Sequence, residues 1–553
     1  MDEITGKQLG EILVERGIIT RTQLEEALKE QKLTGQKIGD ILVEKGLITQ
    51  EELNGALAVQ REVPTLDLSE YLIDAEVVKL IPEEIARTHK LMPVFLENNI
   101  LTVAMANPFD VFVVDELQRR TGYVIQPALV NEMDIRRVHQ QYYGTSEDLA
   151  ELISSIDKKK LRQAENLEEE TSVIKIVNQI IIQAIQERAS DIHFEPEENV
   201  LGLRYRIDGM LVRKNPLPKE LEGAIISRLK IMAGLDIAEK RLPQDGRILM
   251  RVSKREIDFR VSTCPTVHGE NVVLRILDKS SLVVGLESLG FSSEDLQRFK
   301  DVITTPYGIV LVTGPTGSGK TTTLYSALQS LNKEDVNIMT IEDPVEYQFP
   351  HIRQVHVNLK AGLTFAKALR SFLRQDPDII MVGEVRDMET AEIAVQAALT
   401  GHLVLSTLHT NDAPSAFTRL LEMGIEPFMV ASSIIGVVAQ RLIRRVCDNC
   451  KEEYTPSAET LKLLELEGKV SKTAKFVKAK GCKLCNHTGY KGRIGIFEIL
   501  KNSPRIQELA LHRASSFEIK QVGQEEGMKT LRESAIEKLL RGITTVENIL
   551  RVT

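Results

Sequence analysis

A glycine-rich run near the middle of the chain constrains its fold more than any other stretch of the sequence. The apolar segment Gly308-Ile-Val-Leu-Val-Thr313 predicts a buried strand, and Gly314-Pro-Thr-Gly-Ser-Gly-Lys-Thr321 follows it directly. The second segment fits G-x-x-x-x-G-K-[ST], the P-loop pattern, in which a helix begins at the lysine. A strand, a phosphate-binding loop and a helix in this order indicate an α/β domain with a parallel sheet.

The P-loop predicts a nucleotide site, because its glycines let backbone N–H groups turn toward a phosphate at the positive end of a helix. We expect Lys320 to reach the β and γ phosphates of ATP and Thr321 to place its hydroxyl on Mg²⁺. An ordinary glycine-rich turn is the alternative, which the complete match disfavours. The predicted nucleotide-binding residues of the loop are Gly314, Pro315, Thr316, Gly317, Ser318, Gly319, Lys320, Thr321 and Thr322.

Length and composition indicate several soluble domains. At 553 residues the chain is long enough for roughly three or four domains, each with its own core. No apolar run approaches the ~20 residues that span a bilayer, and the N-terminus lacks a secretory signal, so we expect a cytosolic protein. The formal net charge of −9 argues against a nucleic-acid motor, and no nucleic-acid partner is expected.

The N-terminal segment is duplicated, since residues 9–28 recur as residues 38–57. Each copy predicts a short helix that ends at Gly17 or Gly46, followed by a second helix with capping-box spacing at its start. The capping pairs are Thr20 with Gln23 and Thr49 with Glu52. Two helical hairpins packed on each other are the simplest interpretation of residues 1–61.

Three further segments separate this duplication from the P-loop domain. Residues 62–144 mix helices with short strands and predict a small α/β module, whereas residues 145–171 are charged and poor in aromatic residues, as in a mobile linker. Residues 172–279 predict an α+β domain. Its strands carry Arg260 and Arg275, which are either structural or able to reach a nucleotide at a domain or subunit boundary.

The predicted P-loop domain, residues 290–445, carries acidic residues after two further strands. Glu342 and Glu346 follow one strand, and Glu384 ends the next apolar run. In such parallel sheets, ligand-binding and catalytic sites form at the carboxyl ends of the strands. Since Gly383 stands where P-loop enzymes usually have an aspartate, we expect Glu384 to orient or deprotonate the attacking water.

Two histidines flank the predicted strand at 403–406, with His402 before it and His409 in the run that follows it. We interpret both as lying at the mouth of one strand beside the phosphates, where His402 contributes to nucleotide binding and His409 to catalysis. A structural role in satisfied hydrogen bonds is the alternative for each.

Four of the five cysteines form two C-x-x-C pairs, Cys447 with Cys450 and Cys482 with Cys485. In a reducing cytosol such pairs indicate tetrahedral thiolate zinc rather than disulfides. The long interval between the pairs predicts a helix at 458–466 inside a zinc module, residues 446–500. With four cysteine ligands the zinc would be structural and would leave no open position for catalysis.

Basic residues gather in the sequence around these pairs. A solvated face is the simplest interpretation, and contact with a partner or with anionic lipid is the alternative. The residues are Arg441, Arg444, Arg445, Lys480, Lys483, Lys491 and Arg493. The last segment, residues 501–553, predicts helices that close the C-terminal domain.

Together these motifs make the sequence resemble the secretion ATPase superfamily, which powers type II secretion and type IV pilus assembly. The resemblance extends over nearly the whole chain. Four boxes of the family are present: the P-loop, an aspartate box at 340–347, a Walker B variant with glycine at 379–384 and a histidine box at 400–411. The resemblance therefore implies a RecA-like core that hydrolyses ATP with Mg²⁺.

The resemblance also implies roles and partners. Glu384 would be catalytic, Glu342 and Glu346 would be accessory acids, and Arg260 and Arg275 would approach the γ phosphate. The family further implies a homo-hexameric ring and an inner-membrane platform protein as partner. The chain would then be cytoplasmic and peripheral at the inner face of the inner membrane.

The duplicated segment resembles the N-terminal domain of these ATPases, in which paired motifs bind cyclic di-GMP. That motif opens with an arginine, where this chain has Gln8 and Lys37. The planar guanidinium group of arginine stacks on guanine and binds phosphate with two donors. Lysine only partly replaces these contacts and glutamine does not, so we expect any binding here to be weak. The candidate residues are Leu9, Gly10, Lys37, Ile38 and Gly39.

The predicted fold is multidomain α/β: a RecA-like P-loop core preceded by an α+β domain and a helical duplicated N-terminal domain, with a C-terminal zinc module. The predicted function is that of a hexameric cytoplasmic ATPase that drives type IV pilus assembly. A type II secretion motor of the same family is the main alternative, and a DNA-translocating ring is a further one. A non-catalytic cyclic di-GMP receptor is disfavoured by the intact Lys320 and Glu384.

Overall fold

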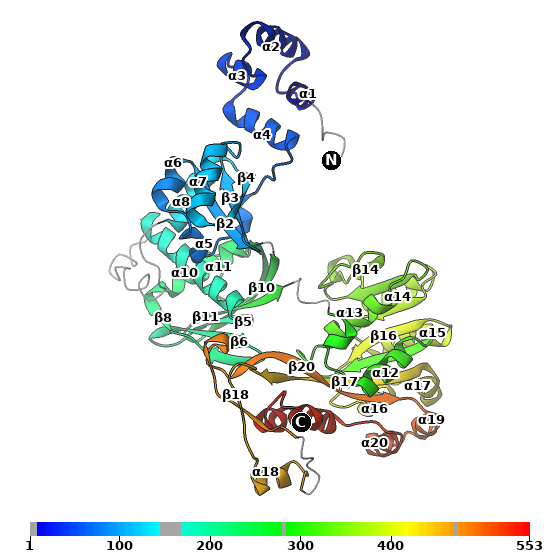
Figure 1. The fold of residues 1–553 in the computed structure, drawn as a ribbon. Coiled ribbons are helices and arrows are strands. Elements are labelled where there is room, and N and C mark those ends of the chain that lie inside the picture. Colours follow the sequence, from blue (N-terminus) through cyan, green and yellow to red (C-terminus); the bar gives the residue numbers. More distant parts are fainter. Residues whose placement is uncertain (1–7, 144–166, 254, 279–283, 468–473) are drawn as a thin grey trace. The chain divides into compact units, whose positions relative to one another are not determined.

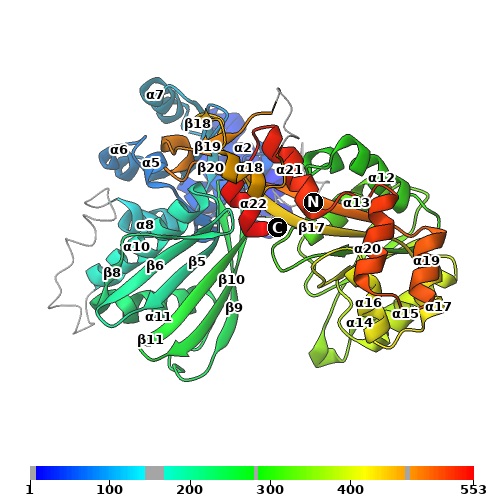
Figure 2. The same cartoon turned by 90° about the horizontal axis from the view of Figure 1, so that it is seen from below.

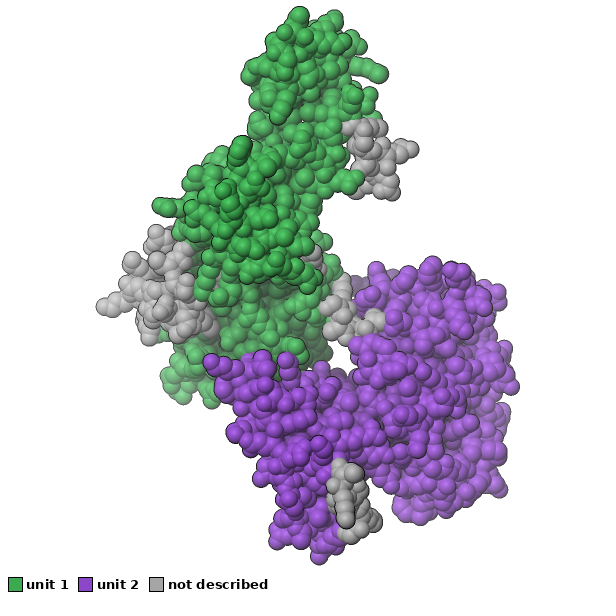
Figure 3. Space-filling view, in the orientation of Figure 1, with its two compact units in different colours: residues 1–278 green, residues 279–553 purple. Residues whose placement is uncertain are grey.

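The computed structural model describes residues 8–143, 167–253, 255–278, 284–467 and 474–553 (Figure 1). The chain divides into two compact units, residues 1–278 and 279–553 (Figure 3). None of the helices in these described stretches has the length and apolar composition that crossing a bilayer requires.

Unit 1 begins with the duplicated segment, which forms α1 (Leu9–Glu15), α2 (Arg21–Thr34), α3 (Ile38–Glu44) and α4 (Gln50–Gln60). Both predicted capping boxes are confirmed, because the Thr20 and Thr49 hydroxyls accept from the N3 backbone N–H and the N3 side chains cap in return. The four helices share one small core around the matched pairs Ile12–Leu13 and Ile41–Leu42.

A small three-stranded sheet follows, formed by β2 (Leu91–Glu97), β3 (Ile100–Met105) and β4 (Val124–Leu129). Strands β2 and β3 are antiparallel, whereas β3 and β4 are parallel. The helices of this part are α5 (Ala75–Val78), α6 (Glu83–Thr88), α7 (Val111–Thr121) and α8 (Glu132–Tyr142).

The larger sheet of unit 1 has the order β1-β9-β10-β11-β5-β6-β7, with β8 beside β6 (Figure 2). Its neighbours are antiparallel, except that the short β1 (Tyr71–Leu72) runs parallel to β9. The other strands are β5 (Ala189–Pro196), β6 (Val200–Ile207), β7 (Met210–Arg213), β8 (Leu217–Pro218), β9 (Gln244–Val252), β10 (Arg255–Thr266) and β11 (Gly269–Asp278).

Two helices, α10 (Leu167–Gln186) and α11 (Glu222–Met232), pack against each other and share the core of this sheet. Helix α10 corrects the predicted linker, because the last five residues of 145–171 are already helical. Their place in the helix follows from the apolar stripe that starts at Val173 and continues to Ile185, which stabilises the turns before it. The rest of the predicted linker lies outside the described residues.

Unit 2 is built on a seven-stranded sheet with the order β14-β13-β15-β16-β12-β17-β20. Every neighbouring pair is parallel except β17 and β20. The strands are β12 (Gly308–Thr313), β13 (Ile338–Glu342), β14 (Ile352–His356), β15 (Ile379–Val382), β16 (Leu403–Leu408), β17 (Ile434–Val446) and β20 (Tyr490–Lys501).

Helices cover both faces of this sheet, so β12 alternates between two cores. Val310 and Val312 face a core shared with α12 (Ser293–Ile303) and α13 (Lys320–Leu331). Ile309 and Leu311 face the core on the other side. That core is formed with α14 (Phe365–Phe372), α15 (Met388–Leu399), α16 (Ser415–Glu422) and α17 (Pro427–Ser433).

The C-terminal part corrects one predicted boundary. Strand β20 pairs with β17 from Gly436 to Val446, so residues 490–500 belong to the central sheet and not to a separate module at 446–500. Between the two strands lie β18 (Lys451–Glu453), the predicted helix as α18 (Ala458–Leu463), and β19 (Val477–Ala479). The chain ends with α19 (Pro504–Leu511), α20 (Ser516–Glu525), α21 (Leu531–Leu540) and α22 (Val546–Val552).

Candidate active site

The P-loop leaves β12 at its carboxyl end and packs tightly against β17. Gly314 has a φ of 149° and Gly319 a φ of 90°, values that favour glycine. A Cβ at Gly314 would lie 2.5 Å from the Gln440 carbonyl oxygen, and one at Gly319 would lie 2.8 Å from Gln440 Nε2. Gln440 also accepts a 2.7 Å hydrogen bond from the Thr323 hydroxyl, so the loop is held between β17 and the start of α13.

Lys320 is the first residue of α13, and its side chain folds back over the loop. Its Nζ donates to the carbonyl oxygens of Gly314 at 2.8 Å and of Pro315 at 3.2 Å. Burial lowers the pKa of Lys320, while the nearby charge of Glu384 raises it. Lys320 is thus a partly desolvated cation at the loop, and Thr321 beside it is exposed.

Glu384 lies two residues beyond the end of β15, at the same carboxyl edge of the sheet as the P-loop. Its side chain is only 15% exposed, forms an ion pair with Arg386, and lies 3.5 Å from His409 Nε2 through Oε2. The loop that carries His409 is anchored to β12, since Thr410 and Thr313 share hydrogen bonds at 2.7 and 2.8 Å. The structure therefore brings Lys320, Glu384 and His409 together.

Glu342 ends β13 and points into the protein. Its carboxylate accepts hydrogen bonds from the Tyr325 hydroxyl, from Thr340 Oγ1 at 2.6 Å and from Gln354 Nε2 at 3.1 Å. Burial raises the pKa of Glu342 despite these donors. In this arrangement Glu342 acts as a buried anchor for α13, whereas Glu346 is partly exposed.

The prediction that His402 and His409 lie at one strand mouth is wrong. His402 precedes β16, whose first residue pairs with Gly308 at the amino end of β12, whereas the P-loop follows the carboxyl end. A six-residue strand rises about 20 Å, so the two histidines lie at opposite edges of the sheet. His402 Nδ1 is instead 2.9 Å from the Ala397 carbonyl oxygen.

Arg260 and Arg275 lie in unit 1, directly opposite each other on β10 and β11. Directly paired residues share a face of the sheet, and the row continues through Arg247 on β9 and Asp191 on β5. Arg275 Nε donates to Asp191 Oδ1 at 3.0 Å. This face therefore carries a row of arginines fixed in part by a buried aspartate.

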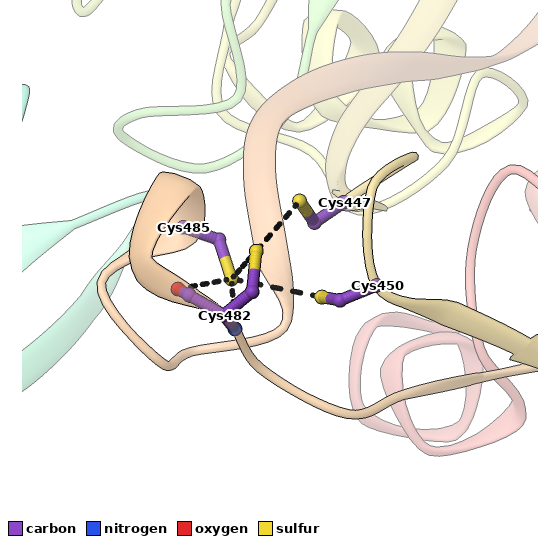
Figure 4. A group of neighbouring side chains, drawn as sticks. All are labelled: Cys447, Cys450, Cys482 and Cys485. Carbon is purple, nitrogen blue, oxygen red and sulfur yellow. Dashed lines mark hydrogen bonds between the residues drawn. The ribbon is translucent and has the colours of Figure 1, made fainter.

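The four cysteines at the far end of β17 and before β20 form one cluster (Figure 4). Their sulfur atoms lie within 4.8 Å of one another. Sγ atoms are 3.8 Å apart between Cys447 and Cys482 and between Cys450 and Cys485, and 3.7 Å apart between Cys482 and Cys485. A zinc–sulfur bond of about 2.3 Å in a tetrahedron gives sulfur separations of about 3.8 Å, so the donor set fits zinc.

Sequence reasoning missed the contribution of β17 to the P-loop. Gln440 was not singled out, and Arg441 was grouped with the basic residues around the cysteines, although its Nη2 donates to Asn411 in the loop after β16. The available signal was the polar pair Gln440-Arg441 directly after the apolar run 434–439.

Comparison with known proteins agrees with this geometry. Residues 166–551 match the family described as Type II/IV secretion system protein. The chain belongs to this family. It is 47% identical to the type IV pilus assembly ATPase PilB of Myxococcus xanthus over 98% of each chain, and 46% identical to type II secretion system protein E of Xanthomonas campestris pv. campestris over 84% of this chain and 83% of that protein.

Residues 61–149 of this secretion-family ATPase match the MshEN domain. The X-ray structure of the Yersinia pseudotuberculosis ATPase DotB has the same fold, with a TM-score of 0.51 at 19% identity, over 68% of this chain and 92% of that one. The predicted family and the predicted ATPase activity are thereby confirmed.

Proposed function

We propose that this secretion-family ATPase drives type IV pilus assembly. The observation that carries the choice is the extent of similarity: the pilus assembly ATPase of M. xanthus matches over 98% of the chain, including the duplicated helices, whereas the X. campestris secretion protein matches over 84%. A type II secretion motor remains the second candidate, because the same family includes both. A DNA-translocating ring is less well supported, because the chain has a net charge of −9 and DNA binding depends on positive charge.

In the proposed mechanism the P-loop residues 314–322 hold the phosphates of ATP, with Lys320 moving from its carbonyl contacts to the β and γ phosphates. Thr321 would supply a hydroxyl to Mg²⁺, and the ion would neutralise phosphate charge. Glu384 orients the attacking water and takes its proton, because its carboxylate is partly buried at the carboxyl edge beside Lys320. His409 positions Glu384 from 3.5 Å.

Arg260 and Arg275 are proposed to reach the γ phosphate across a subunit boundary in a homo-hexamer. Support comes from their direct pairing on one sheet face. The Arg275 side chain is 56% exposed and its Nε donates to Asp191, whereas Arg260 is partly buried. Two charged donors aimed at the γ phosphate would stabilise the charge that develops there. We further propose an inner-membrane platform protein as partner and a location at the cytoplasmic face of the inner membrane.

A structural zinc ion is proposed at Cys447, Cys450, Cys482 and Cys485. The sulfur separations support this assignment, as do the backbone N–H groups of Cys482 and Gly489, each of which donates to Cys485 Sγ at 3.2 Å. Such donors stabilise thiolate charge around a metal. The zinc would hold β17 and the segment before β20 together.

Cyclic di-GMP is proposed as a weak regulator at the starts of α1 and α3. Gln8 and Lys37, the helix N-caps there, are both exposed and without side-chain capping bonds. Gly10 and Gly39 pack against the leucine of the following helix, and a Cβ on either would lie within 2.7 Å of a leucine methyl group, which would have to shift. Titration calorimetry with cyclic di-GMP that shows no heat at high ligand concentration would exclude the site.

Replacing the gene by one encoding Glu384→Gln in the organism that carries it tests the main proposal. The expected result is loss of surface pili by electron microscopy with unchanged secreted proteins. Unchanged pili with lost secretion would instead establish the type II secretion motor. Glu389→Gln, which alters an exposed carboxylate paired with Arg370 at 2.8 Å, is the matched control and should leave both processes intact.

A further inference from the structure

Arg441 lies across the base of the P-loop, although it is distant from the loop in sequence. Strand β17 runs parallel to β12 with Ala439 opposite Thr313, so Arg441 extends beyond the point where β12 becomes the loop. Its Nη2 donates to the Asn411 carbonyl oxygen at 3.2 Å and to Asn411 Oδ1 at 3.1 Å. Because β16, which leads to Asn411, flanks β12 on the other side, the guanidinium crosses the carboxyl end of β12.

Two buried polar atoms at this place have no hydrogen-bond partner among the described residues. They are Arg441 Nη1 and the hydroxyl oxygen of the P-loop residue Ser318, whose side chain is 3% exposed. Buried donors in folded proteins are normally paired. An unsatisfied donor on β17 and an unsatisfied hydroxyl in the P-loop that β17 flanks therefore point to a polar ligand.

The charges around Arg441 indicate an anionic ligand. Its positive charge contributes to the lowered pKa of Lys320, so the two cations lie close together. The acidic groups that face Arg441 are Asp412 and Glu498. Glu498 is already engaged by the backbone N–H groups of Ala413 at 2.8 Å and Leu531 at 3.3 Å, and no carboxylate in the described part of unit 2 forms an ion pair with Arg441.

We propose that Arg441 is a nucleotide-binding residue whose Nη1 binds a phosphate oxygen of the nucleotide held by the P-loop of the same chain. The inference rests on the nucleotide site proposed above and adds a ligand from β17. Because Nη2 remains hydrogen-bonded to Asn411, the same guanidinium group links the phosphates to the loop that carries His409. His409 in turn contacts Glu384. Arg441 thus connects nucleotide occupancy with the position of the water-activating group.

Calorimetric titration of the full-length chain with Mg²⁺ and either ADP or the non-hydrolysable analogue AMP-PNP tests this contact. Arg441→Gln is expected to weaken AMP-PNP binding by 10- to 100-fold, which corresponds to about 1.4 to 2.8 kcal/mol. A loss for AMP-PNP alone assigns the contact to the γ phosphate, and an equal loss for ADP assigns it to the α or β phosphate. The matched control is Arg445→Gln, which removes the same charge from a 51% exposed side chain on β17 and should change neither affinity more than twofold.

Affinities of Arg441→Gln within twofold of the wild-type values for both nucleotides would overturn the proposal, even if hydrolysis were lost. Arg441→Lys decides the matter if the glutamine variant does not fold. Lysine keeps the charge but cannot hold Asn411 and a phosphate with two forked donors, so an intermediate loss is expected. Failure of the wild-type chain itself to bind AMP-PNP would instead refute the proposed nucleotide site.

Discussion

Removal of the Tyr325 hydroxyl is expected to destabilise unit 2 in a pH-dependent manner. This hydroxyl donates to the buried carboxylate of Glu342, which has two further donors, Thr340 and Gln354. A hydrogen bond to a charged group contributes about 1.5–3 kcal/mol, and one between neutral groups about 0.5–1.5 kcal/mol. Tyr325→Phe should therefore cost about 2 kcal/mol while Glu342 is ionised and about half as much once it is protonated.

The direction of the pH dependence follows from the raised pKa of Glu342, whose ordinary value is 4.5. Below pH 4.5 the carboxyl group is protonated and uncharged in both the folded and the unfolded chain, so its burial carries no penalty for desolvating a charge. As the pH rises through the folded-state pKa, the buried carboxylate ionises and stability is lost. Tyr325→Phe removes a donor from the ionised form, so its effect should be larger at a pH well above the ordinary value of 4.5 than at a pH near that value.

Scanning calorimetry of the full-length chain measures this effect. The transition of the nucleotide-binding unit is the one that Mg-ADP shifts to higher temperature. Its midpoint should fall by roughly 4–8 °C at the higher pH and by about half of that at the lower pH. In a Glu342→Gln background the Tyr325→Phe shift should no longer depend on pH. Equal shifts at both pH values in the wild-type background would refute the reasoning.

Further predictions concern the loop, the histidines and the cysteines. Gly314→Ala should abolish ATP hydrolysis, because its Cβ would lie 2.5 Å from the Gln440 carbonyl oxygen, whereas Gly223→Ala, with no atom within 4 Å, should be neutral. His402→Ala should leave kcat within twofold, while His409→Ala should lower it at least tenfold, and equal losses would contradict the placement of His402. Metal analysis should find about one zinc per chain, lost in Cys482→Ser; a chelator that leaves the melting profile unchanged would contradict a structural role.

Local patterns in the sequence predicted local structure well. The apolar run before Gly314 forms a fully buried strand, and the capping pairs at Thr20 and Thr49 form where their three-residue spacing places them. The P-loop was recognisable for the same reason, since its chemistry lies within one continuous segment. Each of these features depends on neighbours in the chain, which the sequence displays directly.

Features that depend on distant segments were not predictable in this way. The two histidines flank one strand, so they are close in the sequence. They cannot share one site, because the whole length of the strand separates them. The pairing of β20 with β17 joins segments separated by the cysteine region, so no local pattern assigned β20 to the central sheet. Arg441 was misplaced for a related reason, because parallel register with β12 decides which residues of β17 meet the P-loop.

The pairing of β17 with β20 also links the cysteine cluster to the P-loop through one ladder, in which Arg441 lies near the middle and Val446 lies at the end beside Cys447. Arg441 and Val446 are both on β17, so about 17 Å of strand separates the residue at the loop from the strand end next to Cys447. A metal ion bound by the four cysteines would resist fraying at that end and would thereby help to hold the hydrogen-bond register of β17 beside the P-loop. By thermodynamic reciprocity, a nucleotide that prefers this register must tighten metal binding by the same factor. A difference between the zinc affinities measured with and without Mg-ADP would then show that the cysteine cluster and the nucleotide site are coupled.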